Sequence, residues 1–145
     1  MPSIRAMKLM ESTHRLVQRL TRGRAGWNFA GMPVIELTTI GRRSGERRAT
    51  MLTSPVKDGT AYVVVASRGG DDSHPAWFLN LRDNPDVEVV IEGRPRIALV
   101  ARIANAEQRA RLWPVIIAKY SIYAGYQKKT DREIPLVLLK PGPEA

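Results

Sequence analysis

The sequence predicts a single, mainly β domain with helical insertions, an α+β fold in which about six mostly antiparallel strands form a small barrel. Short β-branched runs recur along the chain and are separated by glycine-containing turns that are typical of hairpins. Helical patterns stand before or between pairs of strands, which argues against a parallel doubly wound sheet. The 145 residues, of which 43% are hydrophobic, suffice for one domain with a buried core.

The composition excludes several classes of protein. The chain has no cysteine, which rules out disulfides and thiolate metal sites. Its longest apolar runs, such as 63–66 and 136–139, are far too short to span a bilayer. The first 20 residues lack the continuous apolar stretch of a signal peptide. We therefore expect a cytoplasmic location, or a peripheral one at the inner face of the cell membrane.

The formal net charge of +9 implies an anionic partner, which is a nucleic acid, a lipid surface or a multiply charged small molecule. The chain has nine aromatic residues (three Trp, four Tyr and two Phe), and they are not interleaved with the basic ones. Proteins that stack single-stranded bases place aromatic side chains among basic residues. The composition therefore counts against nucleic acid as the partner.

The first 24 residues are predicted to form an amphipathic helix that precedes the barrel domain, which comprises residues 25–145. Within 4–22, seven apolar residues form one ragged face, and five arginine or lysine side chains surround it. A basic amphipathic helix of this kind either binds an anionic membrane surface or packs on its own domain. The sequence leaves these two interpretations open.

The strands are expected in hairpins that follow one another along the chain. β-branched and apolar residues favour each strand, and Lys57-Asp58-Gly59-Thr60 is a hairpin turn. A Gly93-Arg94 turn closes a second hairpin, while Pro55 indicates an edge or a bend in the strand that contains it. The predicted strands are 34–40, 48–56, 61–67, 87–92, 96–103 and 134–140.

Two further helices are predicted between the strands. Pro75 favours the first helical position, so that a short helix spans 76–82. Asn105 and Gln108 have the spacing of a capping box, at the start of a helix that continues to about residue 119. A tyrosine-bearing segment over 120–129 then leads to the last strand.

An arginine-rich turn separates the first two strands. Between Gly41 and Arg48 the sequence reads Gly-Arg-Arg-Ser-Gly-Glu-Arg-Arg. Glycines allow a sharp turn and bring backbone N–H groups close to a ligand, and arginine forks bind phosphate or carboxylate oxygens in pairs. The turn is therefore either a socket for a polyanion or an exposed, solvated basic loop.

Three further segments are candidates for a binding site. Ser67-Arg68-Gly69-Gly70 offers a hydroxyl, a cation and flexible backbone amides. Trp77-Phe78-Leu79-Asn80 begins the short helix, whose N-terminus favours anions, and Phe78 is expected in the core. Tyr120, Tyr123 and Tyr126 recur every three residues and share roughly one helical face. That face is either a wall with hydroxyl tips or an aromatic stripe packed on the domain surface.

Familiar catalytic patterns are missing from the sequence. No spacing resembles a zinc site, a nucleophile elbow or a dinucleotide-binding loop, and no metal site is predicted. The two histidines are His14 and His74, and the adjacent Asp71 and Asp72 are interpreted as solvated loop carboxylates. With so few acid–base groups, catalysis would depend on a cofactor that the protein positions.

Taken in order, these motifs resemble the deazaflavin-dependent nitroreductases, a family that includes quinone reductases. The resemblance extends over about residues 25–141, and its motifs are 38–48, 65–70, 75–81, Asn84-Pro85, Trp113-Pro114, the three tyrosines and 130–135. It implies a split β-barrel related to the flavin-binding oxidases. It also implies coenzyme F-420, an 8-hydroxy-5-deazaflavin whose reduced form donates hydride to quinones, nitroaromatics or activated enones. FMN is the alternative cofactor in related folds.

The resemblance also implies roles for individual residues, because this cofactor carries a phosphodiester and an oligoglutamate tail. Ser67 and the three tyrosines would be catalytic: Tyr120, Tyr123 and Tyr126 wall the substrate pocket, and Ser67 and Tyr123 make polar contacts near the reacting centre. Glu46 would oppose the acidic tail unless it pairs with Arg47. The implied cofactor-binding residues are Arg42, Arg43, Ser44, Gly45, Arg48, Ala49, Thr50, Met51, Ser67, Arg68, Gly69, Gly70, Ala76, Trp77, Phe78, Leu79 and Asn80.

The functional hypothesis is a reductase that transfers a hydride from reduced coenzyme F-420 to a quinone, nitroaromatic or activated enone. One alternative is a carrier that binds deazaflavin, FMN or a lipid surface without turnover. Another is a basic barrel that binds nucleic acid through the same arginines. The oligomeric state and the physiological acceptor stay open at this level.

Overall fold

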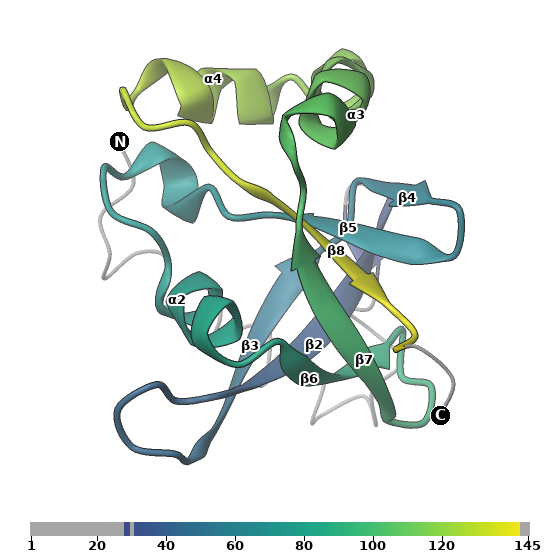
Figure 1. Ribbon diagram of the computed structural model, residues 1–145. Helices are drawn as coiled ribbons and strands as arrows, with labels where there is room; N and C mark the ends of the chain where they lie inside the picture. Colours follow the sequence, from purple (N-terminus) through teal and green to yellow (C-terminus); the bar gives the residue numbers. More distant parts are fainter. Residues whose placement is uncertain (1–27, 30, 143–145) are drawn as a thin grey trace.

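The computed structural model of the chain describes residues 28–29 and 31–142. The predicted N-terminal helix, with its membrane interpretation, lies outside these residues. Eight described strands form one antiparallel sheet that curls into a half-barrel (Figure 1). The strands are β1 (Asn28–Phe29), β2 (Met32–Ile40), β3 (Arg47–Thr53), β4 (Val56–Asp58), β5 (Ala61–Val65), β6 (Asp86–Ile91), β7 (Ile97–Ile103) and β8 (Leu136–Lys140).

The sheet follows the order β1-β2-β6-β7-β8-β5-β4, and β3 pairs with β2 off this path. β2 is the longest described strand and the one that joins the most neighbours. Its residues 34–40 pair with β3 in register with 53–47, and its residues 35–38 pair with β6 on the other side. The start of β2 also pairs with β1. The turn between β2 and β3 is therefore fixed at the end of a long two-stranded ladder.

The mainly β, antiparallel class is confirmed, but the number of strands needs a correction. The two strands beyond the predicted six are β1 and β4, which have two and three residues and are too short for a hydrophobic pattern. β4 extends through Lys57 and Asp58 of the predicted turn, and only its first residue, Val56, belongs to the predicted strand 48–56. That strand breaks at Ser54-Pro55, where the Ser54 hydroxyl donates to the carbonyls of Val56 (3.1 Å) and Val63 (2.8 Å).

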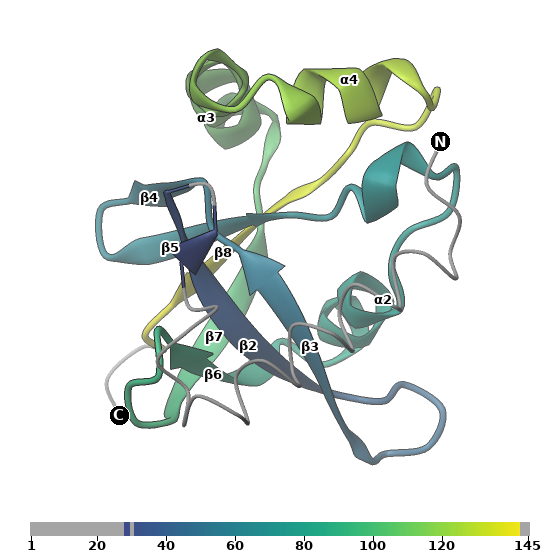
Figure 2. The same cartoon turned by 180° about the vertical axis from the view of Figure 1, so that it is seen from behind.

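Helices occupy the ends of the half-barrel. The Asn105 side chain accepts from the Gln108 N–H at 2.8 Å, and the Gln108 side chain accepts from the Asn105 N–H at 3.0 Å, so the capping box is confirmed. α3 and α4 lie over one end of the sheet, while the β2–β3 turn projects from the opposite end (Figure 1 and Figure 2). The helical segments are η1, a 3-10 turn (Arg68–Gly70), α2 (Ala76–Asp83), α3 (Ala106–Lys119) and α4 (Ile122–Lys128).

None of the helices in the described residues is long and apolar enough to cross a membrane.

Buried apolar side chains form two clusters on opposite faces of the sheet. The first lies inside the curl and includes Phe78 and Leu81 of α2. The second lies between the sheet and the pair α3–α4, and it includes Leu112, Ile116 and Tyr123. Each cluster joins strands that are far apart in the sequence to a helix that covers them.

β5 and β8 contribute to both clusters, because successive residues of a strand point to opposite faces. Val64 and Leu139 belong to the inner cluster, while Val63 and Leu138 belong to the cluster under α3 and α4. All four are at most 3% exposed. Burial on both faces explains why these two strands are continuously apolar in the sequence.

This two-sided burial predicts that neighbouring leucines of β8 are equally important. Leu138→Ala and Leu139→Ala should each lower the free energy of unfolding by about 2–5 kcal/mol, since each leaves a cavity in a different cluster. Urea unfolding of the purified variants measures the change. Ile97→Ala on β7 is the control, because Ile97 is 44% exposed and its truncation should change stability by about 0.5 kcal/mol or less. A tolerated Leu138→Ala or Leu139→Ala would contradict the assignment of two cores.

Candidate functional site

The β2–β3 turn is held in shape by its own backbone. The N–H of Gly41 donates to the Glu46 carbonyl at 2.7 Å, and the N–H of Gly45 donates to the Gly41 carbonyl at 2.8 Å. The Ser44 hydroxyl accepts from the Glu46 N–H at 3.1 Å. A side chain at Gly41 would place its Cβ 2.6 Å from the Ser44 oxygen, so the turn closes tightly at this point. Sequence position alone does not reveal this closure.

Strand alternation sends the arginines of this turn in different directions. Arg47 points to the outer face of the sheet, where it forms an ion pair with Glu88 of β6. Arg48 pairs with Glu46 at 3.2 Å, so the partner of Glu46 is Arg48 and not Arg47. Among the described residues, Arg42 and Arg43 have no carboxylate partner, and their side chains are exposed. These two guanidinium groups are therefore the ones available to an anionic ligand.

Asn80 of α2 connects this turn to the half-barrel. Its Oδ1 accepts from the backbone N–H of Arg42 at 3.1 Å, and its Nδ2 donates to the Thr39 hydroxyl at 3.1 Å. Asn80 and Thr39 are 5% and 0% exposed, so the two hydrogen bonds are shielded from water. The predicted role of Asn80 was support of a cofactor. The structure gives it a hydrogen-bonding role in fixing the direction of the arginine turn.

The turn after β5 brings three consecutive residues into the left-handed region. Arg68, Gly69 and Gly70 have φ angles of 46°, 65° and 85°. For a non-glycine residue such as Arg68 this conformation costs on the order of 1–3 kcal/mol and persists only where surrounding contacts enforce it. Ser67, just before the turn, is 9% exposed, and its hydroxyl makes no hydrogen bond to the described residues. A buried hydroxyl without a protein partner is suited to a bound ligand.

Gly70 of this turn lies against the C-terminal end of α4. A Cβ at this position would lie 2.6 Å from the Tyr126 carbonyl oxygen and 3.0 Å from the Lys129 Cβ. The glycine thus permits the turn and the tyrosine helix to pack directly on each other.

The three tyrosines do not have equivalent surroundings. Tyr123 is 7% exposed within the second cluster, and its hydroxyl lies 3.2 Å from the Thr53 hydroxyl and 3.6 Å from the sulfur of Met32. Burial raises the pKa of Tyr123 and also that of Tyr126. Tyr120 and Tyr126 are half-buried, and the Tyr126 ring meets Tyr123 edge-on at 6.1 Å. The packed-stripe interpretation therefore describes Tyr123 fully, while Tyr120 and Tyr126 pack on the same cluster but stay partly exposed.

The remaining predicted residues lie along β3 and the start of α2. Phe78 is 4% exposed in the inner cluster, as the sequence analysis expected, and its ring is 4.6 Å from that of His74. Trp77 and Leu79 are half-buried and pack on the same cluster, and Ala76 is exposed. On β3, Ala49 is exposed, Thr50 is half-buried and Met51 is buried.

The predicted residues that lie outside β3 thus gather toward its two ends. Arg48 stands at one end beside the arginine turn, and Thr53 stands at the other end beside Tyr123. Five residue steps of extended strand separate them, a length of about 17 Å. η1 and α4 are in contact at the tyrosine end, and α2 is bonded to the turn at the other. The arrangement suits an elongated ligand with an acidic group at one end.

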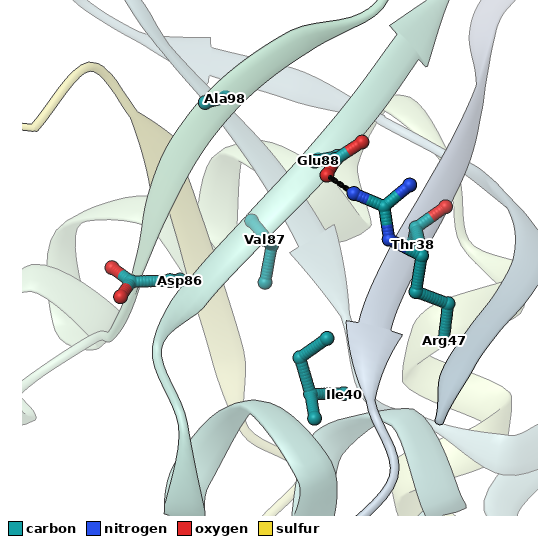
Figure 3. A pocket seen from close by; sticks show the side chains of 7 residues that line it. All are labelled: Thr38, Ile40, Arg47, Asp86, Val87, Glu88 and Ala98. Carbon is teal, nitrogen blue, oxygen red and sulfur yellow. Dashed lines mark hydrogen bonds and ion pairs between the residues drawn. The ribbon is translucent and has the colours of Figure 1, made fainter. Parts of the chain in front are cut away.

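A separate hollow of about 200 Å³ lies on the outer face of the sheet (Figure 3). The Arg47–Glu88 ion pair crosses its rim, and none of the predicted site residues lines it. Arg47 and Glu88 neutralise each other there, and the hollow shares no residue with the predicted site, so it is distinct from the candidate site. The residues around it are Thr38, Ile40, Arg47, Asp86, Val87, Glu88 and Ala98.

Comparison with known proteins agrees with this geometry. The sequence model of the family described as F-420H(2)-dependent quinone reductase matches residues 10–141. The chain belongs to this family. The family resemblance inferred from the motifs is confirmed, and the protein is a reductase that uses coenzyme F-420.

Relatives of this quinone reductase family cover most of the chain. An F-420H(2)-dependent quinone reductase of Mycobacterium tuberculosis is 38% identical over 130 residues, which are 87% of this chain and 86% of the relative. The solved structure of an F-420-H2 dependent reductase is 37% identical, covers 74% of this chain and 94% of its own, and superposes with a TM-score of 0.65. Another, described as a domain-swapped dimer, is 32% identical, covers 89% of this chain and 99% of its own, and has a TM-score of 0.67.

More distant solved structures share only the fold. The heme storage protein HutZ of Vibrio cholerae is 17% identical, covers 87% of this chain and 89% of its own, and has a TM-score of 0.54. The half-barrel is thus used with different ligands, and the residues at the site must distinguish them.

The residues of this family member fit an acidic cofactor. Arg42 and Arg43 offer two guanidinium groups without carboxylate partners, and Ser67 offers a buried hydroxyl without a described partner. In the described part of the chain no group of three or more His, Cys, Asp or Glu side chains is placed to hold a metal ion. The donor set therefore suits phosphate, carboxylate and polar ring atoms.

Sequence reasoning gave no role to Arg132 and left His74 unexplained. The Arg132 guanidinium donates to the carbonyls of Ala66, Ser67 and Asp71, and it lies 3.2 Å from the Nδ1 of His74. Burial, and then the adjacent Arg132 charge, lowers the pKa of His74, so the imidazole is neutral at pH 7. The only sequence signal was that Arg132 belongs to a family-like motif, which does not identify its contacts.

Two glycines of the site allow conformational strain and steric contact to be separated. Gly45→Ala should cost about 1–2 kcal/mol, because its φ is 73° but nothing lies within 4 Å of the added Cβ. Gly70→Ala should cost clearly more, since a similar φ is combined with a 2.6 Å contact to the Tyr126 carbonyl, and overpacking adds about 1–3 kcal/mol. Urea unfolding without cofactor measures both. If both variants lost the same free energy of unfolding, η1 and α4 would not pack as described.

Proposed function

We propose that this reductase holds coenzyme F-420 along β3 and passes its hydride to a quinone. Arg42 and Arg43 bind the acidic tail and phosphate at one end of the strand. Ser67, the backbone of 68–70 and the tyrosine helix bind the ring and the acceptor at the other end. Two observations carry the proposal. Two guanidinium groups without a carboxylate partner stand at one end of β3, and a buried hydroxyl without a described partner stands beside η1, which contacts α4, the helix that meets the other end of β3.

The arginine end provides affinity. A guanidinium bound to phosphate or carboxylate gains charge-assisted hydrogen bonds, and a pair of them binds an extended anion at more than one point. The Asn80 bond to the Arg42 backbone keeps the turn in one orientation before the ligand arrives. Less conformational freedom is then lost on binding. Arg48 contributes less, because Glu46 already neutralises part of its charge.

The tyrosine end provides alignment. When bound, the reduced deazaflavin supplies a hydride from its carbon 5. The Ser67 hydroxyl donates a hydrogen bond to the acceptor oxygen on which negative charge develops. The Tyr123 hydroxyl stays between Thr53 and Met32 and holds α4 against the end of β3. Tyr120 and Tyr126 present their exposed edges to a planar acceptor.

The proton for the reduced acceptor comes from solvent in this proposal. Burial raises the pKa of Tyr126, so its hydroxyl donates a hydrogen bond at pH 7 but releases a proton reluctantly. The His74 imidazole is occupied by Arg132 and lies in the loop before α2. Substitution of Ser67 or of a tyrosine should therefore lower the rate without abolishing it, because alignment and not acid–base chemistry carries the reaction.

Quinones are the acceptor class that we favour, and nitroaromatics and activated enones are the alternatives. All three present an electron-poor centre conjugated to an oxygen that gains charge. We also retain the cytoplasm as the location, with the first 24 residues either at the inner membrane surface or on the domain. These finer assignments rest on the family resemblance and on the basic composition of the N-terminal segment.

One experiment tests the function as a whole. Fluorescence titration of the protein with coenzyme F-420 and with FMN should give tight binding of the deazaflavin only. Loss of reduced-cofactor absorbance is then followed with a soluble naphthoquinone, a benzoquinone, a nitroaromatic and a cyclic enone. Quinone-dependent oxidation is the expected result. Binding without oxidation by any acceptor would instead identify a carrier, and binding of an oligonucleotide in competition with the cofactor would identify a nucleic-acid protein.

Arginines of the same turn provide a matched test of the binding mode. Arg42→Ala and Arg43→Ala should each weaken cofactor binding by about 1.5–3 kcal/mol, the value of a hydrogen bond to a charged group. Arg47→Ala removes the same charge four or five positions away. Because Arg47 lies on the outer face and is paired with Glu88, this variant should leave affinity near wild type. Fluorescence titration at fixed ionic strength measures the three variants. Equal effects of all three would indicate a diffuse charge effect and no defined clamp.

A further inference from the structure

Arg132 lies in the connection between α4 and β8, and its backbone is fixed on both sides. Its N–H donates to the Thr130 hydroxyl at 3.3 Å, and its carbonyl accepts from Gln127 Nε2 at 2.8 Å. The side chain is half-buried. From this fixed position it reaches the loop between β5 and α2, which is about sixty residues earlier in the chain.

Every donor group of the Arg132 guanidinium is used by that loop. Nε donates to the Asp71 carbonyl at 2.8 Å, and one terminal nitrogen donates to the Ser67 carbonyl at 2.9 Å. Both terminal nitrogens lie 3.3 Å from the Ala66 carbonyl, and one lies 3.2 Å from His74 Nδ1. A planar fork of five N–H groups matches these acceptors, whereas the single ammonium of a lysine does not. Because its donors are occupied, Arg132 is not itself free to bind an anion.

The loop that Arg132 holds carries the strained turn of the candidate site. Arg68 is left-handed without being a glycine, and such a conformation requires surrounding contacts that enforce it. Arg132 bonds to carbonyls on both sides of this turn, at Ser67 before it and at Asp71 after it. Gly70 packs on α4 from the other direction. The turn is thus held between α4 and the segment that follows α4.

We propose that Arg132 is a positioning residue for coenzyme F-420. It holds the Ser67 hydroxyl and the 68–70 backbone in the arrangement that binds the deazaflavin ring. The inference rests on the proposed function, since it assumes that the ring lies at this turn. Arg132 acts through the loop and touches neither cofactor nor acceptor. His74 takes part in the same positioning. Its neutral Nδ1 accepts a hydrogen bond from Arg132, and its ring packs on Phe78 of α2.

The chain offers a matched control in Arg109. Its half-buried guanidinium also fixes the segment between α4 and β8, with Nε donating to the Ile134 carbonyl at 3.0 Å and a terminal nitrogen donating to Gln127 Oε1 at 3.1 Å. No contact joins Arg109 to the loop at 66–74 among the described residues. Arg109 and Arg132 therefore share a structural environment, but only Arg132 reaches the candidate site.

The experiment compares Arg132→Lys with Arg109→Lys in the full-length protein. Both should lower the melting temperature modestly, because each loses planar hydrogen bonds. Arg132→Lys should also raise the dissociation constant for F-420, measured by fluorescence at a temperature where both variants are folded, by roughly tenfold to a hundredfold, as expected when a binding group is displaced. Arg109→Lys should bind F-420 like the wild type. In the quinone assay, kcat/KM for Arg132→Lys should fall together with cofactor affinity.

The outcomes separate the two proposals. Wild-type protein that fails to bind F-420 would overturn the proposed function itself. Wild-type binding with unchanged affinity in Arg132→Lys, or equal loss of affinity in Arg132→Lys and Arg109→Lys, would overturn only the positioning role. If Arg132→Lys does not fold, His74→Phe tests the same positioning of the loop. This variant keeps an aromatic ring on Phe78 but removes the nitrogen that accepts a hydrogen bond from Arg132. Its affinity for F-420 should fall several-fold, and wild-type affinity would overturn the inference.

Discussion

The structure depends on the burial of β5 and β8 on both faces. Val63 and Leu138 face the helices, whereas Val64 and Leu139 face the interior of the half-barrel, and water reaches none of them appreciably. A single strand pair thus separates and supports two cores. The end of β5 consequently emerges at the boundary between them. The turn at 67–70 follows directly, and this is where the sheet, α4 and the loop to α2 meet.

The alternation of side chains along β3 then decides which arginines of the turn have a carboxylate partner. Arg47 and Arg48 are neighbours, yet one forms an ion pair on the outer face and the other pairs locally with Glu46. The formal charge of the chain is large, but two of the arginines at this sheet, Arg47 and Arg96, are already paired with Glu36 and Glu88. What distinguishes the site is that two adjacent arginines without a carboxylate partner, Arg42 and Arg43, stand on one rigid turn.

Buried and half-buried polar side chains set the rigidity of the site. Asn80 fixes the arginine turn, the Thr53–Tyr123 contact fixes α4 against β3, and Arg132 fixes the loop after β5. Each bond joins segments that a ligand would otherwise have to order on binding. A family of reductases whose chemistry resides in a cofactor gains most from such preorganisation, because alignment is the main contribution that the protein makes.

The sequence by itself determined the antiparallel class, the main strands, the 57–60 hairpin, the capping box at Asn105 and the family, because these follow from residues close together in the chain or from an ordered set of motifs. It missed the short strands β1 and β4, the partner of Glu46, the burial of Tyr123 and the contacts of Arg132. The decisive hydrogen bonds of the site join residues 38 to 70 positions apart. Only tertiary packing decides such partners, since it depends on how two cores fill and not on local propensity.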